Sequence, residues 1–424
     1  MILNRLERKV RRYLKKHKPL LVFVAGSVGK TTTVEAIATV LSEKYRVRAR
    51  EGNDDVHFSV PTGIMGVEYP DNPQSIRQWR RVLQAMSLRI RQERDVDVIV
   101  QEVGTDTPGT MGRFGRYLVP DIAVITAVSE EHMESFGDLD AVAAEELSVA
   151  HFSKLTIVNR DNVDVKYAGL ADTHTIDTYG LGEKAEYRLV VSDADPLEGR
   201  IGQLICPEWD EVPLNAQLIG DHSLEAAVAA ACVGAKLGLT SQQVAVGVSK
   251  IKPMSGRMQV LRGLNETTLI DDTYNANPLT MSAALDTLYK TEAPMHIAIL
   301  GSMNELYGGS PQAHEKIGSL CDPTKLDWVV TIGEEAEEFL APMAMKAGCR
   351  VEAFANPYDA GAFVHRVMEP GAVILAAGSG DGVFAEEALA ILLHSTDDEQ
   401  RLVRQTEAWL KVKHEQFART VAED

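Results

Sequence analysis

The chain has few cysteines and no long apolar run, and both shortages limit where it works. Four cysteines are spread over 424 residues without a Cys-x-x-Cys spacing. This pattern argues against a disulfide framework or a zinc cluster and indicates reduced thiols in a cytoplasmic protein. No stretch approaches the roughly 18 apolar residues of a membrane span. The N-terminus also lacks the apolar core of a signal peptide.

Positive charge is scarce as well. Lys and Arg number 43 and the net charge is −18, which argues against a general nucleic-acid surface but allows an anionic ligand in a local pocket. Residues 1–18 are the exception, because eight Lys or Arg and one acid, Glu7, lie between Arg5 and Lys18. Apolar residues recur there at helical spacing. We expect a basic helix that packs on its own domain, with contact to a membrane surface or a partner as the weaker alternative.

Apolar, strand-like runs alternate with amphipathic helical stretches in two series. The first series is 20–25, 97–103, 121–126 and 155–159, and the second is 267–271, 296–301, 327–332 and 372–377. The alternation predicts an α/β protein with a P-loop-type central domain, built on a mostly parallel sheet, followed by a Rossmann-like C-terminal domain. The expected divisions are a basic helix at 1–18, a central domain at 19–256 and a C-terminal domain at 257–424. We also expect a small antiparallel β insertion at the edge of the sheet, at 171–218, and a final helix at about 398–417.

A phosphate-binding loop follows the first strand-like run. Gly26-Ser27-Val28-Gly29-Lys30-Thr31 lies between that run and a helical pattern. Backbone N–H groups and the helix N-terminus would face an anion, Lys30 would add a charge, and the Thr31 hydroxyl would suit Mg²⁺. Val24 stands where the longer form of the motif has its first glycine. The match is therefore to the short form, Gly-x-x-Gly-Lys-Thr.

Two further polar positions lie near the ends of expected strands. Glu102 ends the strand at 97–103 and His132 follows the strand at 121–126. Because ligands bind at the carboxyl ends of parallel strands, we expect Glu102 to share Mg²⁺ with Thr31 and His132 to contact a metal or a phosphate. The alternatives are a solvated acid and a structural histidine.

The fourth motif, Asp271-Asp272-Thr273-Tyr274-Asn275-Ala276-Asn277-Pro278, permits two interpretations. It is either a turn with a helix cap or a pair of carboxylates that contacts ribose. Arg257, which follows Ser255-Gly256, is placed to reach a triphosphate as a charge-assisted donor.

Taken in order, these motifs resemble the Mur ligase family, the ATP-dependent amide ligases of peptidoglycan synthesis and related pathways, and within it the MurF-like branch that adds D-alanyl-D-alanine. The resemblance covers about residues 19–395. The matching segments are Gly26 to Thr33, Val60-Pro61, Glu102-Val103-Gly104, His132 to Gly137, Asn159-Arg160-Asp161, Gly220-Asp221-His222, Gly256-Arg257, Asp271 to Pro278, Leu300 to Leu306, His314 and Gly378-Ser379.

The resemblance implies a role for each matched site residue. Lys30 and Arg257 would contact ATP phosphates and Asp272 the ribose. Thr31 and Glu102 would bind one Mg²⁺ and His132 a second. The implied ATP-binding residues are Gly26, Ser27, Val28, Gly29, Lys30, Thr31, Thr32, Arg257 and Asp272, and the implied catalytic residues are Lys30, Glu102, His132 and Arg257. In the reaction of this family, a substrate carboxylate attacks the γ-phosphate, and an amine then attacks the acyl phosphate to form an amide.

The chain departs from the family pattern in three ways. Only about 20 residues precede the P-loop strand, so we expect the UDP-sugar-binding N-terminal domain to be missing. Glu146 stands fourteen residues after His132, where the family often has a carbamylated lysine. We hypothesise that its carboxylate replaces the carbamate as a metal ligand, the alternatives being a shift of one residue in the match or a plain surface acid. Expected polar contacts are altered at Ser223, Ala226, Ser302, the loop Asn53-Asp54-Asp55-Val56, and Ala377-Gly378-Ser379-Gly380.

The sequence therefore predicts a cytoplasmic, ATP- and Mg²⁺-dependent amide-forming ligase that joins a carboxylate to an amine on a cell-wall-type peptide. One alternative is the same chemistry on a substrate without UDP, such as a cofactor, a pseudomurein-type peptide or a poly-amino-acid. The other is a non-catalytic nucleotide-binding homologue, against which the presence of Lys30, Glu102 and His132 argues.

Overall fold

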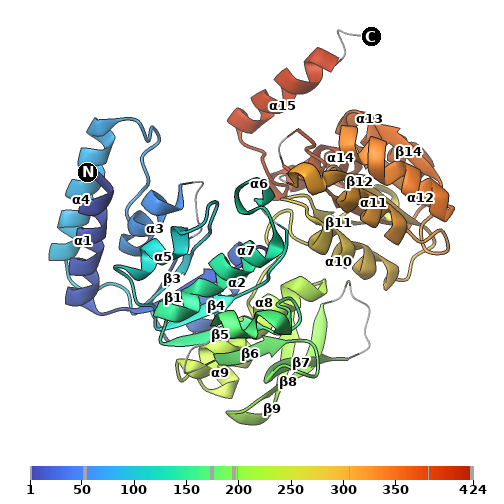
Figure 1. The fold of residues 1–424 in the computed structure, drawn as a ribbon. Helices are drawn as coiled ribbons and strands as arrows, with labels where there is room; N and C mark the ends of the chain where they lie inside the picture. The colour runs from blue at the N-terminus through green and yellow to red at the C-terminus, as the bar shows by residue number, and fades with distance from the viewer. Residues whose placement is uncertain are drawn as a thin grey trace. The chain divides into compact units, whose positions relative to one another are not determined.

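The computed structural model describes residues 2–50, 55–130, 132–171, 176–192, 197, 199–304, 306–380 and 382–420. The chain divides into two compact units (Figure 1). Unit 1 contains residues 1–192, 200–217 and 224–251, and unit 2 contains 193–199, 218–223 and 252–424. Each unit has its own sheet with helices packed on it, which confirms the α/β class predicted from the sequence.

Within the described residues, nine strands form the sheet of unit 1, in the order β2-β3-β1-β4-β5-β6-β7-β8-β9. The pairs from β2 to β7 are parallel, and the last two pairs are antiparallel. The strands are β1 (Leu20–Ala25), β2 (Val47–Arg50), β3 (Val98–Glu102), β4 (Ile122–Ile125), β5 (Leu155–Asn159), β6 (Ile176–Gly180), β7 (Tyr187–Val191), β8 (Arg200–Cys206) and β9 (Trp209–Ala216).

The antiparallel strands expected at 171–218 do lie at the edge of this sheet, but the first part of the segment continues the parallel order. β6 pairs in parallel with β5, and β7 in parallel with β6. Only β8 and β9 are antiparallel. Short strands show the same alternation of apolar residues in either direction, so the sequence pattern did not distinguish the two arrangements.

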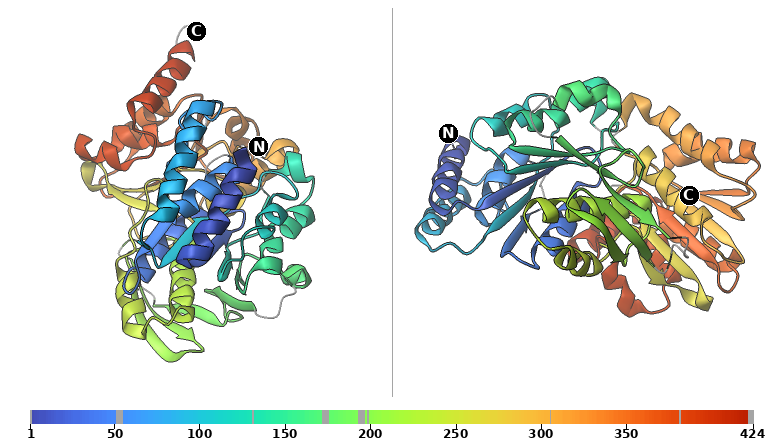
Figure 2. Two further views of the ribbon diagram at one scale, coloured as in Figure 1. Left: turned by 90° about the vertical axis from the view of Figure 1, so that its left-hand side faces the viewer. Right: turned by 90° about the horizontal axis from the view of Figure 1, so that it is seen from below.

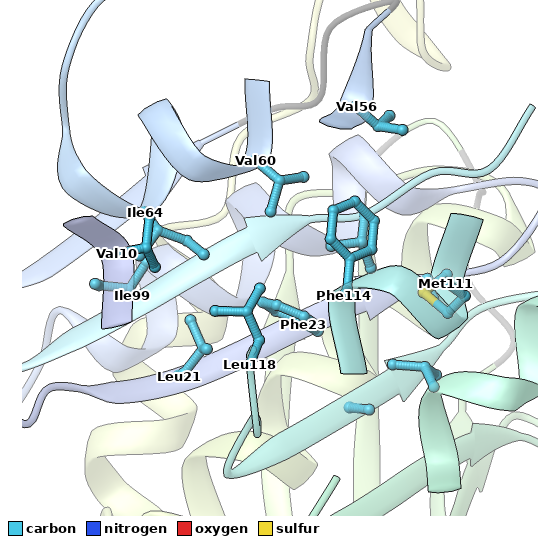
Figure 3. Packing of buried hydrophobic residues seen from close by; sticks show 14 of the residues in the cluster. Val10, Leu21, Phe23, Val56, Val60, Ile64, Ile99, Met111, Phe114 and Leu118 are labelled. Carbon is cyan, nitrogen blue, oxygen red and sulfur yellow. The ribbon is translucent and has the colours of Figure 1, made fainter. Parts of the chain in front are cut away.

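Helices cover this sheet and bury its apolar side chains. They are α1 (Ile2–His17), α2 (Lys30–Leu41), α3 (Val56–Met65), α4 (Ile76–Arg91), α5 (Thr110–Gly115), α6 (Met133–Phe136), α7 (Leu139–Leu147), α8 (Asp221–Lys236) and α9 (Ser241–Ser249). Figure 3 shows one core cluster, in which Phe23 of β1 and Ile99 of β3 lie beneath Val60 of α3 and Phe114 of α5. Strands buried in this way read as nearly continuous apolar runs, which is why the sequence located them.

The basic N-terminal segment forms the predicted helix. α1 buries Leu6, Val10 and Tyr13 in the same core cluster, against α3 and α4. The expectation that the helix packs on its own domain is confirmed. None of the helices in the described ranges combines the length and apolar content that crossing a bilayer requires.

In the described part of unit 2, six strands follow the order β10-β11-β15-β12-β13-β14, and all pair in parallel except β10 with β11. They are β10 (Gln259–Arg262), β11 (Thr268–Asp272), β12 (His296–Gly301), β13 (Trp328–Ile332), β14 (Val351–Phe354) and β15 (Val373–Ala377). Separate core clusters form around residues of α10 (Pro278–Tyr289), α11 (Ser310–Leu320) and α12 (Ala341–Ala347), and around residues of α13 (Pro357–Val367) and α14 (Glu386–Leu392).

The single final helix expected at 398–417 is wrong. A 3₁₀ turn occupies Thr396–Arg401, and α15 starts only at Glu407 and runs to Thr420. Arg404 between them has a φ of 55°, a left-handed conformation that cannot continue an α-helix. Its side chain pairs with buried Glu386, so the tertiary ion pair coincides with the break in the helix.

Buried charges attach α15 to unit 2. Lys413 is fully buried, and its Nζ lies 2.9 Å from a Glu386 oxygen and 2.6 Å from a Glu387 oxygen. Two carboxylates facing one ammonium would repel each other strongly without it. The predicted packing of the final helix on the second unit therefore rests on this ionic contact.

We expect Lys413→Ala to lower the free energy of unfolding of unit 2 by about 3–5 kcal/mol, because it leaves buried Glu387 without its cation while Glu386 keeps only Arg404. Lys411→Ala on the same helix is the control, since the Lys411 side chain is 78% exposed. That control should change the value by less than about 0.5 kcal/mol. Urea unfolding of the two variants is the measurement, and equal midpoints would contradict the structural role of Lys413.

Candidate active site

The phosphate-binding loop begins at the end of β1 in a conformation that requires glycine. Gly26 has a φ of 120°, and a Cβ there would lie 2.4 Å from Thr126 Oγ1 and 2.9 Å from the Ala127 backbone. Gly29, with a φ of 79°, directly precedes α2, which begins at Lys30. Val28 and Thr32 are partly exposed beside it. A strand, a glycine turn and a helix N-terminus thus form the predicted anion cradle.

Two side chains of this loop contact backbone groups close to it. Lys30 Nζ donates to the carbonyl oxygens of Gly26, at 2.7 Å, and Ser27, at 3.1 Å. Ser27 Oγ accepts from Ser129 N at 3.1 Å, which links the loop to the segment after β4. The Lys30 ammonium therefore lies over the cradle.

Thr31 and Glu102 are brought together as the sequence predicted. In the sheet register, Val24 of β1 faces Glu102 of β3, so the carboxylate lies at the level of the loop. Thr31 Oγ1 donates to Glu102 Oε2 at 2.8 Å. Both residues are partly exposed. A hydroxyl and a carboxylate are hard oxygen donors, and this pair fits a Mg²⁺ ion.

His132 lies beside an acid that the sequence analysis did not single out. Its backbone is left-handed, with a φ of 50°, at the start of α6. Nε2 is 3.5 Å from Asp106 Oδ1. Asp106 follows Glu102 in the segment after β3. Its position close to the end of that strand could have identified it from the sequence as a candidate site residue. The described residues contain no group of three or more His, Cys, Asp or Glu side chains that could hold a metal by themselves.

Glu146 lies against the phosphate loop. It is 2% exposed, and its Oε2 accepts from Gly26 N at 2.8 Å. The neighbouring Glu145 accepts from Gly109 N at 2.8 Å and from Met111 N at 2.6 Å, at the start of α5. These contacts show two consecutive acids that each hold a backbone segment of the site. A metal-ligand role for Glu146 stays a prediction.

In unit 2, the paired carboxylates at the end of β11 hold the turn that carries Arg257. Asp271 accepts from Gly256 N at 3.1 Å and from Thr273 Oγ1 at 2.6 Å. Asp272 Oδ1 accepts from Met258 N at 3.1 Å. Burial raises the pKa of Asp271 to about 6 and that of Asp272 to about 7. Asp272 is only 5% exposed and contacts backbone, so its predicted contact with ribose remains unsupported by its surroundings.

This turn positions Arg257, and the guanidinium of Arg257 is not fully hydrogen-bonded. Its Cζ lies 4.1 Å from the centroid of the Tyr274 ring, a cation–π distance. Its Nε is buried and has no hydrogen-bond partner among the described residues. Burial and the nearby charge of Arg257 lower the pKa of His222 to about 4, so that imidazole is neutral near pH 7.

Arg404 is a further residue of this region that sequence reasoning missed. Its guanidinium donates to the carbonyl oxygens of Thr273 and Tyr274. Its Nη1 lies 2.9 Å from where a Cβ of Gly380 would stand. Position 380 lacks the charge of the family element, but Arg404, 24 residues later in the chain, places its guanidinium beside Gly380. No local spacing could have revealed this contact.

Other matched positions prove to organise loops. His314 is fully buried, and its Nε2 accepts from Met303 N at 2.9 Å. Ser379 Oγ accepts from Asn304 N at 2.8 Å. Asn277 caps α10 in a reciprocal arrangement with Thr280. The turn-and-cap interpretation of the motif at 271–278 therefore holds for its second half.

Two hollows lie on either side of residues 67–71 in unit 1. One, of about 650 Å³, is lined by residues that include Glu35, Arg50 and Ser59. The other, of about 540 Å³, is lined by residues of α4 that include Arg81. Neither is lined by the described residues of the phosphate loop. The positions Asn53 and Asp54, at which contacts were expected to be altered, lie outside the described residues.

Comparison with known proteins places this geometry in a class. Residues 24–234 match the Mur ligase middle domain, and residues 256–380 match the Mur ligase glutamate ligase domain. A P-loop with a neighbouring threonine–carboxylate pair, set in that middle domain, defines an ATP-dependent ligase that forms amide bonds. The chain belongs to the Mur ligase family.

Two proteins similar to this chain in sequence have the same name. The chain is 27% identical over 348 residues to the UDP-N-acetylmuramoyl-tripeptide–D-alanyl-D-alanine ligase of Bacillus subtilis, covering 81% of this chain and 69% of that protein. It is 28% identical over 331 residues to the enzyme of that name from Treponema pallidum, covering 76% of this chain and 64% of that protein.

Solved structures share the fold. MurF from Acinetobacter baumannii matches with a TM-score of 0.75 and 21% identity, over 92% of this chain and 80% of that one. MurF ligase from Thermotoga maritima, solved with ADP, gives 0.74 and 20%, over 92% and 83%. A folylpolyglutamate synthase from Mycobacterium tuberculosis gives 0.61 and 17%, over 91% and 94%.

We expect the stability of unit 2 to fall as the pH rises through the range in which Asp272 ionises. The pKa of about 7 in the folded state lies above the ordinary value of 3.8, so the folded protein binds this proton more tightly than the unfolded chain does. Stability from this group is therefore present below about pH 4 and lost as pH rises toward 7. Asp272→Asn should reduce the loss between pH 5 and pH 7 by about 2 kcal/mol. Urea unfolding of both proteins at the two pH values tests this, and parallel pH curves would contradict it.

Two substitutions separate the roles of Glu146. Glu146→Leu should lower the free energy of unfolding by about 1–3 kcal/mol, because Gly26 N–H would be left buried without an acceptor. Glu146→Gln keeps an acceptor oxygen but removes the charge. If the side chain only holds the loop, Glu146→Gln should keep both stability and Mg²⁺ dependence. A strong loss of Mg²⁺ affinity in a stably folded Glu146→Gln protein would instead favour the metal-ligand role.

Proposed function

We propose that this chain joins an amine to the carboxylate of a cell-wall-type peptide precursor, with ATP consumed through an acyl phosphate. The observation that carries the proposal is the Thr31–Glu102 pair, 2.8 Å apart beside a strand–glycine–helix phosphate loop. Binding and hydrolysis of a nucleotide alone would not require the Mur ligase C-terminal domain, which this chain also has.

The residues of unit 1 supply the binding of the triphosphate. Backbone N–H groups from Val28 to Thr31, at the start of α2, face the β- and γ-phosphates, since the N–H groups of Gly26 and Ser27 already bond to Glu146 and Ala127. Lys30 exchanges its contacts with the Gly26 and Ser27 carbonyls for phosphate oxygens. Its charge then offsets the negative charge that the transferring phosphoryl group carries to the substrate carboxylate.

Thr31 and Glu102 would hold one Mg²⁺, and His132 with Asp106 is the candidate pair for a second. When bound, Mg²⁺ neutralises phosphate charge and aligns the reacting oxygens. The described residues offer each ion one such pair and no larger group of His, Cys, Asp or Glu side chains. The second ion rests on the weaker contact, at 3.5 Å.

Arg257 of unit 2 is the candidate phosphate contact from the C-terminal domain. Asp271 and Asp272 fix the backbone on both sides of it, and Tyr274 supports its guanidinium. A planar guanidinium with an unused N–H is suited to an oxyanion. Arg257 is therefore the residue of unit 2 that we propose as a phosphate contact.

The substrates are proposed from the relatives. Their names describe addition of D-alanyl-D-alanine to a UDP-N-acetylmuramoyl tripeptide. The altered positions at Ala377 and Gly380, which lack the charges of the family element, favour testing other amines and other carboxylates beside this pair.

The direct test is phosphate release from ATP against a panel of acceptors, with mass spectrometry of the products. The panel contains UDP-muramoyl tripeptide, free peptides and amino acids, each with D-alanyl-D-alanine or single amino acids as the amine. An amide product with the UDP-tripeptide establishes the proposal. An amide only with a carboxylate that lacks UDP moves the activity to that substrate class. No amide with any carboxylate would support a non-catalytic homologue.

We expect Lys30→Ala and Glu102→Gln to lower the turnover number by at least about a hundredfold, since each removes a charge that acts on the phosphoryl group. Glu102→Gln should in addition raise the Mg²⁺ concentration needed for half-maximal rate. Arg46→Ala is the control, because Arg46 forms an exposed ion pair with Asp97 outside the loop. Retention of full activity by Lys30→Ala would overturn the assignment of the phosphate site.

A further inference from the structure

The positive charge of this acidic chain is concentrated on two helices. α1 carries seven Lys or Arg and one acid, and α4 carries five Arg and no acid, in a protein with a net charge of −18. The two helices contact each other in unit 1. Figure 2, in its left view, shows them side by side on the face turned toward the viewer.

The cations of α1 lie on the side opposite its packed face. Leu6, Val10 and Tyr13 are buried, whereas Arg5, Arg8, Arg12 and Lys15 are exposed. At 3.6 residues per turn, these four basic side chains share one stripe along the helix. Packing on the domain therefore uses the apolar stripe and leaves the basic stripe to solvent.

α4 continues the same surface. Trp79, Val82 and Met86 are buried, and the exposed side chains opposite them include Arg77, Arg80, Arg81 and Arg91. Lys16 Nζ donates to the Ile90 carbonyl at 2.7 Å, and Lys9 Nζ bonds to Ser87 Oγ. These bonds join the edges of the two helices and make their basic stripes one surface, here called the basic face.

Little within the protein offsets this charge. In the described part of the chain, no ion pair connects the exposed cations of the basic face with an acid. Arg89 of α4 pairs with Asp95, and Glu7, the acid of α1, pairs with Arg113 of α5. Burial and the like charges of Arg12 and Arg91 lower the pKa of Lys9. Arg12 of α1 and Arg91 of α4 thus both repel the Lys9 ammonium. Such repulsion is expected of a surface that binds an anionic partner.

Apolar side chains lie among these cations. Leu88 of α4 is 59% exposed and stands three residues before Arg91, and Ile76 is 64% exposed and stands four residues before Arg80. Residues at such spacings share a helix face. Phosphodiester chains gain little from exposed leucine and isoleucine, whereas the interface of an anionic bilayer accommodates both cations and apolar side chains.

We propose that the basic face of α1 and α4 docks this protein on the surface of an anionic lipid bilayer. The attachment is peripheral and reversible: lipid phosphates meet the arginines and lysines, while Ile76 and Leu88 reach the boundary of the acyl chains. This inference is independent of the proposed ligase activity, because it uses none of the residues of the phosphate loop or of the Arg257 turn.

The test is flotation of the full chain with two kinds of vesicle, one of phosphatidylcholine alone and one with about a third phosphatidylglycerol. We expect binding only to the anionic vesicles and a steep loss as salt is added. The variant with Arg5→Gln, Arg8→Gln, Arg12→Gln and Lys15→Gln should bind at least about a hundredfold more weakly. Leu88→Gln should bind about fivefold more weakly.

Matched controls remove equal charge or apolar area elsewhere. Lys184→Gln, Lys316→Gln, Lys325→Gln and Lys346→Gln together also remove four exposed cations, and Met345→Gln removes an exposed apolar side chain. Both should bind as the unchanged protein does, and thermal unfolding checks that every variant is folded. Equal loss in the two four-residue variants would overturn the proposal. Tighter binding to a DNA duplex than to anionic vesicles would overturn it in favour of a nucleic acid.

Discussion

The close approach of Gly26 to the end of β4 is the constraint on which the candidate site depends. Thr126 Oγ1 and the Ala127 backbone occupy the space that any side chain at position 26 would need. The backbone polar groups of Gly26 are both used, the N–H by Glu146 and the carbonyl by Lys30. One residue without a side chain thus links β1, β4, α7 and the lysine of the phosphate loop. Any larger residue would displace all of these together.

Carboxylates hold backbone throughout both units, and this use explains why so many acids surround sites for anions. Glu145 and Glu146 accept N–H groups in unit 1, and Asp271 and Asp272 do so in unit 2. A buried carboxylate that accepts backbone N–H groups orders a loop without a long side chain. Its charge is partly offset by those dipoles, so a phosphate nearby is repelled less than the number of acids suggests. Glu102 and Asp106, which are not fully buried, are the acids that we propose for metal binding.

The sequence was sufficient for features that depend on neighbouring residues, and insufficient for those that depend on distant ones. The strands at 20–25 and 155–159 and the phosphate loop follow from local apolar runs and glycine positions. The Thr31–Glu102 contact was also predictable, because parallel strand ends meet at one edge of a sheet. The place of Arg404 beside Gly380 was not, since it depends on a helix break and an ion pair with Glu386. Equally, nothing in the spacing at 145–146 showed that these acids face backbone.

The net charge of the chain does not show where its charged residues lie. A total of −18 describes a chain that should avoid anions, yet the phosphate loop and the helices α1 and α4 present cations to solvent. At physiological salt, charges interact over about 8 Å, so an anion at the α1–α4 surface responds to the arginines beside it and hardly to acids on the far side of the domain. The amphipathic pattern of α1 shows why the segregation arises. A helix that packs through Leu6, Val10 and Tyr13 must turn its basic residues outward. Packing of the core therefore determines where the positive charge is displayed, and the charge of the whole chain does not.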